Sequence, residues 1–283
     1  MPEIDIDHLR SWIGRSRDVE DFVTPRLVAE YRATLAPHLA PVADGEAPLA
    51  LHWCLGPETP AADALGPDGH AAKGGFLPPV PLPRRMWAGG EVETLAPLRV
   101  GDRVVRRETV ADVAVKTGRT GTLCFVTVRH DYETERGPAI RDRQDIVYRE
   151  ASRPGDAAPA PKPAPDEDAA GNDTAWSVEA NSVLLFRYSA MTFNGHRFHY
   201  DFPYATQVEG YAGLVVHGPM QASLLLNLAA ARLGRVPARF RYRGVAPMIA
   251  GSRFAVAGRR EGDGFRAWTA VDGHVHMEAE AGD

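Results

Sequence analysis

The feature that most constrains this chain is an Ala- and Pro-rich segment near its middle, ASRPGDAAPAPKPAPDEDAAGN at 151–172. Ala and Pro supply 12 of its 22 residues, so it has little apolar surface to bury. Prolines favour extended polyproline II backbone, and such segments commonly serve as semi-rigid linkers. The sequence therefore predicts an N-terminal domain at 1–150, a linker at 151–172 and a C-terminal domain at 173–283.

Both predicted domains contain a helix and a series of strands. Helical spacing of apolar residues covers 24–36, where Thr24 is the predicted N-cap, and 219–233, which Gly234 ends. Strand patterns cover 86–95, 102–115, 123–133, 139–149, 239–244, 253–260, 265–271 and 274–279. Residues 56–83 are rich in Gly and Pro without any period and predict a long loop. The fold class is therefore predicted as α+β.

A short internal repeat supports duplication of one unit. Residues 96–104 (APLRVGDRV) align with residues 246–254 (APMIAGSRF), and both precede a predicted strand. Together with the linker, this repeat favours two copies of a helix-plus-antiparallel-sheet unit.

Composition excludes several classes of protein. The formal net charge of −5 and the pI near 6.1 offer no basic face for a nucleic acid. No apolar run approaches the roughly 20 residues that span a bilayer, and the acidic start of the chain is unlike a signal peptide. Cys54 and Cys124 lack metal-binding or disulfide spacing. We expect a soluble cytoplasmic protein that binds neither nucleic acid nor membrane.

The residues that carry chemistry are concentrated at 189–220, SAMTFNGHRFHYDFPYATQVEGYAGLVVHGPM. His196, His199, His217 and Asp201 fall inside it, directly before the predicted helix. Backbone N–H groups at a helix start are unpaired, and the dipole there favours a developing oxyanion. Because Pro219 has no N–H, the Gly218 amide is the predicted oxyanion donor.

This segment resembles the signature of the MaoC-type, R-specific enoyl-thioester hydratases and dehydratases. The family pattern is D-x-N-P-I-H-x-D followed by a helix that H-G-M opens, and here the corresponding runs are FNGHRFHYD (193–201) and HGPM (217–220). Residues 75–90 and 97–102 resemble the degenerate domain that precedes the catalytic one in fused members. The resemblance thus covers nearly the whole chain and implies a double hotdog fold. FNGHRFHYD is most similar to the hydratases of mesaconyl-C4-CoA and itaconyl-CoA.

The resemblance implies a hydro-lyase that adds water to an α,β-unsaturated acyl-CoA. It places His199 on the catalytic His and Asn194 on the catalytic Asp. Asn cannot exchange a proton but can hold a water molecule, so acid–base work concentrates on His199. His196 is then a second proton carrier or a group that orients Asn194.

Four other readings of the same residues remain open. A 3-hydroxyacyl-thioester dehydratase of the fatty-acid type would use the same groups, and a hotdog thioesterase would bind the same substrates. A non-catalytic acyl-CoA-binding hotdog would explain the loss of the family Asp at Asn194. Finally, His196, His199 and Asp201, with His217, have a spacing that can ligate Fe(II) or Zn(II).

The remaining predictions concern binding. His217, Arg197, Arg84 and Arg85 are predicted substrate-binding residues, since the two adjacent arginines can pair with a carboxylate or with CoA phosphates. The 56–83 loop is expected to cover the cleft. No metal or other cofactor is predicted, because CoA enters as part of the substrate. Homo-oligomers fit the sequence, which does not fix the oligomeric state.

Overall fold

The computed structural model describes residues 4–118, 121–150, 162–165 and 173–283. The first half of the chain contains α1 (Ile6–Arg10), β1 (Ser16–Phe22), α2 (Pro25–Leu35), the short 3₁₀ helices η1 (Leu51–Cys54) and η2 (Ala62–Ala64), β2 (Arg84–Thr94), β3 (Arg103–Gly118), β4 (Gly121–Thr134) and β5 (Gly137–Arg149). The second half contains β7 (Asp173–Glu179), α3 (Ser182–Met191), η3 (Arg197–His199), a π-helical turn η4 (Tyr204–Val208), α4 (Gly218–Leu233), β8 (Arg239–Gly244), β9 (Arg253–Glu261), β10 (Gly264–Val271) and β11 (His274–Gly282).

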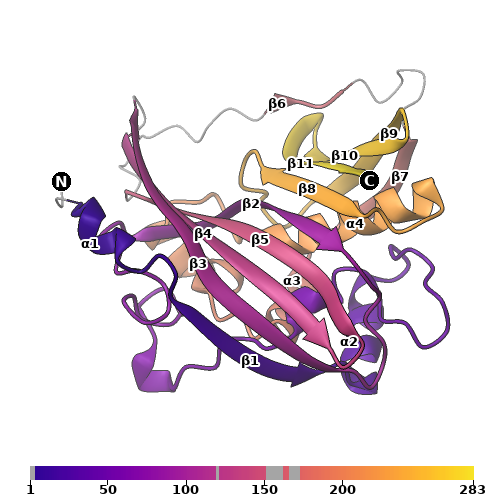
Figure 1. The fold of residues 1–283 in the computed structure, drawn as a ribbon. Coiled ribbons are helices and arrows are strands. Elements are labelled where there is room, and N and C mark those ends of the chain that lie inside the picture. The colour runs from indigo at the N-terminus through magenta and orange to yellow at the C-terminus, as the bar shows by residue number, and fades with distance from the viewer. Residues whose placement is uncertain (1–3, 119–120, 151–161, 166–172) are drawn as a thin grey trace.

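One continuous antiparallel sheet runs through both halves (Figure 1). Its strand order is β1-β3-β4-β5-β2-β8-β11-β10-β9-β7, and β2 pairs with β8 where the halves meet. The order on one side of this junction mirrors the order on the other. Edge strands that would otherwise be open therefore pair with each other, which is the pseudo-twofold arrangement of a double hotdog.

Backbone hydrogen bonds around the internal repeat confirm that the halves are equivalent. Three bonds in the first half have counterparts in the second half, in which the residue of the repeat is 150 positions later. The pairs are Gly101 N to Val23 O with Gly251 N to Ala180 O, Ala47 N to Leu98 O with Val216 N to Met248 O, and Val100 N to Gly45 O with Ala250 N to Leu214 O.

Because these bonds align positions of the two halves, the helices at equivalent positions can be compared directly. Ala47 corresponds to Val216, so the start of α4 corresponds to the segment that leads into η1. In the second half α4 has 16 residues and packs against β9, β10 and β11. In the first half the helix stops after the four residues of η1, and the chain enters the Gly- and Pro-rich loop. Part of the first half's sheet is therefore left without a covering helix.

The sequence predicts most elements within a few residues. Thr24 caps α2 by accepting a hydrogen bond from Leu27 N at 3.1 Å, and Gly234 ends α4 with φ +72°. Strand β1 was missed because its sequence, SRDVEDF, is mostly polar and has no alternation of apolar and polar residues. Residues 182–188 form the start of α3, whose N-cap is Asn181.

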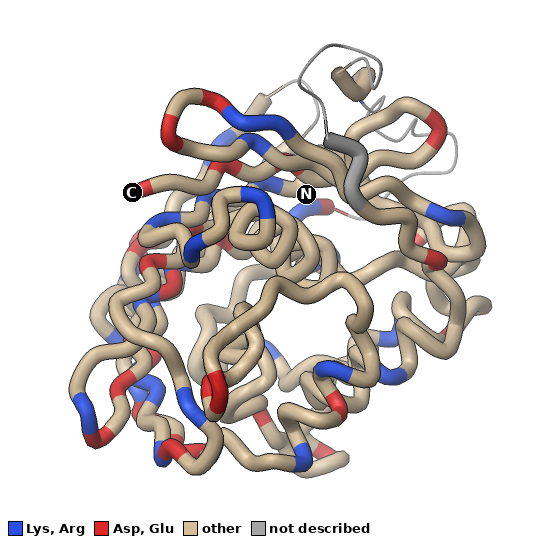
Figure 2. Tube along the Cα trace, turned by 90° about the vertical axis from the view of Figure 1, so that its right-hand side faces the viewer, with Lys and Arg blue, Asp and Glu red and all other residues tan. Residues whose placement is uncertain are grey.

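The predicted linker falls largely at 151–161 and 166–172, which lie outside the described residues; between these ranges Lys162–Pro163 (β6) pair with β11. In the part of the chain that the structure describes, no helix is long and apolar enough to cross a membrane. Basic and acidic residues are interspersed along the chain rather than gathered by sign (Figure 2).

Candidate active site

A cavity of about 930 Å³ lies where the two halves meet. Its walls include Asn194, His196, His199 and Gly218 from the second half. The first half contributes strand residues and parts of the 56–83 loop, the segment expected to cover the cleft, so this loop forms part of the cavity wall. The walls are largely apolar, with polar groups at a few positions, as is typical of small-molecule sites.

His199 has the geometry of a general base. It lies on η3 and is 5% exposed. Nδ1–H donates to the carbonyl oxygen of Val215 at 2.7 Å, which fixes the tautomer and leaves Nε2 as an acceptor. Burial, followed by the neighbouring His217 and His196, lowers the pKa of His199 well below its ordinary value. The imidazole is therefore neutral at pH 7 and able to accept a proton.

His217 packs against His199 and is not among the residues that line the cavity. The two imidazoles stack with centroids 3.5 Å apart and planes 14° apart, and His217 is fully buried. His217 Nε2 shares a hydrogen bond of 2.8 Å with Ser189 Oγ from α3. Burial lowers the pKa of His217 to about 3. The structure thus gives His217 a positioning contact where the sequence predicted substrate binding.

Asn194 is held by a turn at the end of α3. Phe193 has φ +49°, a left-handed conformation that reverses the chain, and Asn194 N then donates to Ser189 O at 2.8 Å. The Asn194 side-chain oxygen accepts the backbone N–H of His196 at 2.9 Å. Within the described ranges the Asn194 amide NH₂ has no hydrogen-bond acceptor, so this group can donate to a water molecule or substrate.

Gly218 begins α4 directly against Trp87 of β2. A Cβ at Gly218 would lie 2.8 Å from Trp87 Cε3, closer than real Cβ contacts. The Trp87 indole is fixed by stacking on Tyr242 at 4.5 Å and by donating to Gln144 Oε1 at 3.2 Å. Glycine at this position therefore allows the helix start to approach the cavity wall.

The 56–83 loop brings two residues that the sequence analysis did not identify. Asp68 and His70 hydrogen-bond through Oδ2 and Nδ1 at 3.0 Å, and the His70 ring lies 4.3 Å from the His196 ring. The loop docks closely, since a Cβ at Gly69 would lie 2.0 Å from Gly195 O. Burial, then the charge of Arg85, lowers the pKa of His70 to about 4.

His196 lies between this loop and a buried ion pair. Its Nε2 is 3.6 Å from Glu209 Oε1, and Glu209 Oε2 accepts Arg84 Nε at 3.0 Å. Burial acts to raise the pKa of Glu209, but His196 and Arg84 outweigh it and keep the carboxylate ionised. Arg84 also covers the Tyr211 ring at 4.6 Å. Arg84 is thus engaged with protein groups and is not among the cavity-lining residues, whereas Arg85 is.

Arg197 and Asp201 pair with each other, and neither is among the residues that line the cavity. Arg197 donates to Asp201 Oδ2 at 2.7 and 2.9 Å and to Pro67 O at 3.1 Å. The structure therefore gives Arg197 a role in holding the loop, where the sequence predicted substrate binding.

The metal set suggested by the sequence is not assembled among the described residues. Asp201 is taken by Arg197, and His199 Nδ1 is taken by Val215 O. In that described part, the potential ligands that lie within 4.8 Å of one another are those of Asp68, His70 and His196. Two of these three already hydrogen-bond each other.

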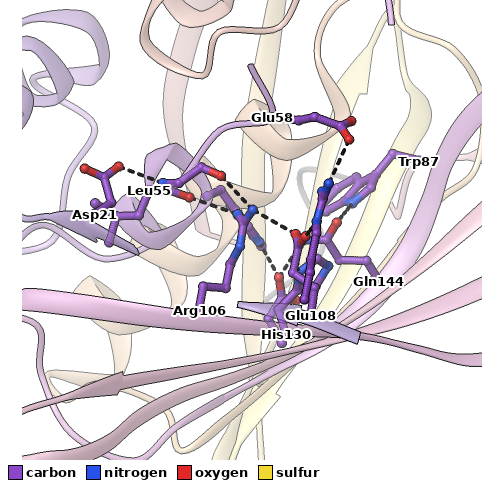
Figure 3. Close-up of polar contacts among 12 residues, drawn as sticks. Asp21, Leu55, Glu58, Trp87, Arg106, Glu108, His130 and Gln144 are labelled. Carbon is purple, nitrogen blue, oxygen red and sulfur yellow. Dashed lines mark hydrogen bonds and ion pairs between the residues drawn. The ribbon is translucent and has the colours of Figure 1, made fainter. Parts of the chain in front are cut away.

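A row of polar side chains crosses the sheet where the first half lacks a long helix (Figure 3). Arg17, Glu108, His130 and Asp142 pair in register across β1, β3, β4 and β5, and the first three line the cavity. Burial acts to raise the pKa of Glu108, but His130, Arg106 and Arg17 lower it to about 2. This row gives the cavity a second polar region on the first half's sheet.

Comparison with known proteins places the chain among thioester hydratases and dehydratases. Residues 50–250 match the family described as hydroxyacyl-thioester dehydratase type 2. A mesaconyl-C(4)-CoA hydratase of Chloroflexus aurantiacus is 42% identical over 257 residues, which cover 89% of each chain. The mitochondrial hydroxyacyl-thioester dehydratase type 2 of Schizosaccharomyces pombe is 38% identical over 52 residues, 18% of this chain and 17% of that one.

Solved structures confirm the fold. A MaoC-like dehydratase has a TM-score of 0.70 at 14% identity and covers 96% of this chain and 98% of its own. HtdX of Mycobacterium tuberculosis has a TM-score of 0.65 at 18% identity, with 94% and 98% covered. A double hotdog protein of the same organism has a TM-score of 0.57 at 15% identity, with 95% of each chain covered.

Proposed function

This chain belongs to the hydroxyacyl-thioester dehydratase type 2 family, and we propose that it catalyses the reversible hydration of mesaconyl-C4-CoA or a closely related short, branched dicarboxylyl-CoA. The 42% identity to a mesaconyl-C(4)-CoA hydratase supports this choice of substrate. The observation that carries the reaction class is the buried His199, fixed as a neutral base beside Asn194 and the start of α4.

The proposed reaction uses one water molecule and three groups of the protein. Gly218 N–H polarises the thioester carbonyl, and the α4 dipole stabilises the enolate that develops there. The Asn194 amide holds the water, and His199 Nε2 accepts one of its protons as the oxygen bonds to the β-carbon. The His199 imidazolium then returns that proton to the α-carbon. One O–H bond of water and the π bond of the double bond are broken, and one C–O and one C–H bond form.

In this proposal, burial sets the protonation state of His199. A lowered pKa keeps His199 neutral before water attacks and makes its imidazolium a strong acid afterwards. His196 is the second group that could carry a proton, since its ring lines the cavity and Glu209 lies beside Nε2.

The test is a substrate screen that follows loss of the enoyl-thioester ultraviolet absorbance. Mesaconyl-C4-CoA, itaconyl-CoA and crotonyl-CoA are compared with wild type, His199→Ala and His274→Ala, an exposed histidine on β11. We expect turnover of a dicarboxylyl ester by wild type and His274→Ala, and a loss of about 10²–10⁴-fold in His199→Ala. Turnover of crotonyl-CoA alone would instead assign the protein to the fatty-acid type of 3-hydroxyacyl-thioester dehydratase. Absence of turnover with all three would refute the proposal.

The remaining parts of the proposal concern the binding partner, the cellular compartment and the oligomeric state. The binding partner in this proposal is the acyl-CoA substrate. The reaction uses groups of the protein and water, and CoA takes part only as a portion of the substrate. We expect a cytoplasmic enzyme. The pairing of β2 with β8 already joins two hotdog units within one chain, and homo-oligomers can add to this arrangement.

A further inference from the structure

Arg84 and Arg85 are adjacent at the start of β2 but have different surroundings. Arg84 is 6% exposed and forms an ion pair with Glu209. Arg85 is half-buried and lines the cavity. Among the described residues, the Arg85 side chain forms neither a hydrogen bond nor an ion pair, while its backbone pairs with Tyr148 of β5. A half-buried guanidinium without a carboxylate retains its five donors for a ligand, and its planar fork matches a carboxylate.

The position of Arg85 brings it close to the reacting groups. Successive residues of a strand point to opposite faces, so Arg85 and Trp87 share one face of β2. The Trp87 ring contacts the start of α4 at Gly218. On the other side, the charge of Arg85 acts on His70, the loop residue whose ring packs on His196. Arg85 therefore lies between the oxyanion donor and the loop.

Several charged groups lie close to Arg85 in this corner. Two carboxylates, Asp68 and Glu209, are surrounded by three cations, Arg84, Arg85 and Lys73. Lys73 donates to the carbonyl oxygens of Val80 and Leu82, and Arg84 is paired. Among the described residues Arg85 forms no ion pair, and in a largely apolar cavity an unpaired charge is costly and an incoming anion is stabilised.

The proposed substrate supplies such an anion at the right place. In mesaconyl-C4-CoA the second carboxylate is bonded to the β-carbon, the atom that receives the hydroxyl group. It must therefore lie beside the water held by His199 and Asn194, within the same corner of the cavity.

We propose that Arg85 binds the second carboxylate of the substrate and so selects dicarboxylyl over alkyl acyl groups. This assignment rests on the proposed function and deepens it by naming the residue that sets specificity. A second cavity-lining arginine, Arg149, ends β5, and its charge acts on Tyr211 rather than on the loop pair. Arg149 is therefore the weaker candidate and serves as a comparison.

The experiment uses pairs of substrates that differ only in carboxylate against methyl. Mesaconyl-C4-CoA and 3-methylcrotonyl-CoA form the reactive pair, and their kcat/KM values are compared. Methylsuccinyl-C4-CoA and isovaleryl-CoA form a saturated pair, whose Kd values calorimetry measures without turnover. The variants are Arg85→Gln, Arg85→Lys, Arg149→Gln and Arg143→Gln. Arg143 on β5 is the matched control, because its side chain is 52% exposed and pairs with Asp145.

We expect Arg85→Gln to lower the preference for the carboxylate about 10–100-fold in both pairs, the range for a charge-assisted hydrogen bond. The methyl compounds should bind Arg85→Gln as they bind wild type, which also shows that the variant is folded. Arg85→Lys should keep part of the preference, since it retains the charge but not the planar fork. Arg143→Gln should behave as wild type.

Three results would overturn the assignment. An equal loss for both members of each pair would place Arg85 at a CoA phosphate. A loss of preference in Arg149→Gln but not in Arg85→Gln would transfer the role to Arg149. Unchanged preference in Arg85→Gln, with wild type still active on mesaconyl-C4-CoA, would refute this inference alone. If wild type neither hydrates mesaconyl-C4-CoA nor prefers a carboxylate, the proposed function fails and the inference fails with it.

Discussion

Gly218→Ala tests the oxyanion donor through a single added methyl group. That Cβ would lie 2.8 Å from Trp87 Cε3, and ordinary contact begins at 3.4 Å, so the helix start and the indole must separate by about 0.6 Å. The indole resists this movement, because it stacks on Tyr242 and donates to Gln144. We therefore expect the start of α4, with its N–H at residue 218, to move instead.

The magnitude follows from two known costs. Overpacking of this kind destabilises a fold by about 1–3 kcal/mol, and a misplaced oxyanion donor costs roughly 10²–10³ in kcat. Kinetics with the best enoyl-CoA substrate and urea unfolding measure the two effects separately. We expect kcat to fall about 10²-fold while the variant remains folded.

Two further variants isolate the cause. Gly282→Ala is the control, because its nearest neighbour would be Gly264 Cα at 3.9 Å. Trp87→Phe in combination with Gly218→Ala removes ring atoms and should restore part of the lost rate. A Gly218→Ala enzyme with kcat within about threefold of wild type would refute the argument, since an oxyanion donor displaced by this contact would cost far more.

Three other predictions follow from the site. In the proposed cycle His199 carries the proton both ways, so His196→Gln should lower kcat less than about tenfold; a loss as deep as in His199→Ala would identify His196 as the group that protonates the α-carbon. Ser189→Ala leaves His217 Nε2 buried without its partner and should cost about 1–3 kcal/mol in urea unfolding, whereas an unchanged midpoint would contradict the 2.8 Å hydrogen bond. Burial lowers the pKa values of His52 and His217 to about 3, so below an unfolded pKa of about 6.5 the unfolded state binds more protons. The free energy of unfolding should therefore fall as pH drops from about 6.5 towards 3, by about 2 kcal/mol per histidine between pH 7 and 5, and a flat profile would contradict this burial.

The sequence predicts those site residues that lie close to one another along the chain. Residues 193–201 and 217–220 name His199, Asn194 and Gly218, and all three line the cavity. The helix that begins at Gly218 is also predictable, because its caps are carried by neighbouring residues. In these cases one short stretch of sequence carries both the element and its chemistry.

Proximity in sequence does not give the direction in which a side chain points. His217 and Arg197 belong to the same motif, yet they contact Ser189 and Asp201. Their contacts are set by the packing of α3 and of the loop, which a local pattern does not contain.

Residues brought from far along the chain were missed for the same reason. Asp68 and His70 come from a loop whose sequence has no period, and they reach the site because Gly69 packs backbone to backbone against Gly195. The Gly-rich composition of 66–75 was the only local signal of that close approach. Arg84 and Arg85 could not be distinguished, because their surroundings depend on Glu209 and on the facing half.

The central claim is that His199 adds water across a double bond and leaves the thioester intact. Incubating mesaconyl-C4-CoA in ¹⁸O-labelled water with wild type and His199→Ala, followed by mass spectrometry, tests it directly. The account predicts an intact CoA thioester that carries one ¹⁸O as a hydroxyl at the β-carbon, formed by wild type and not by His199→Ala. Label in a free carboxylic acid with release of CoA would identify a thioesterase, and hydration that persists in His199→Ala would contradict the account.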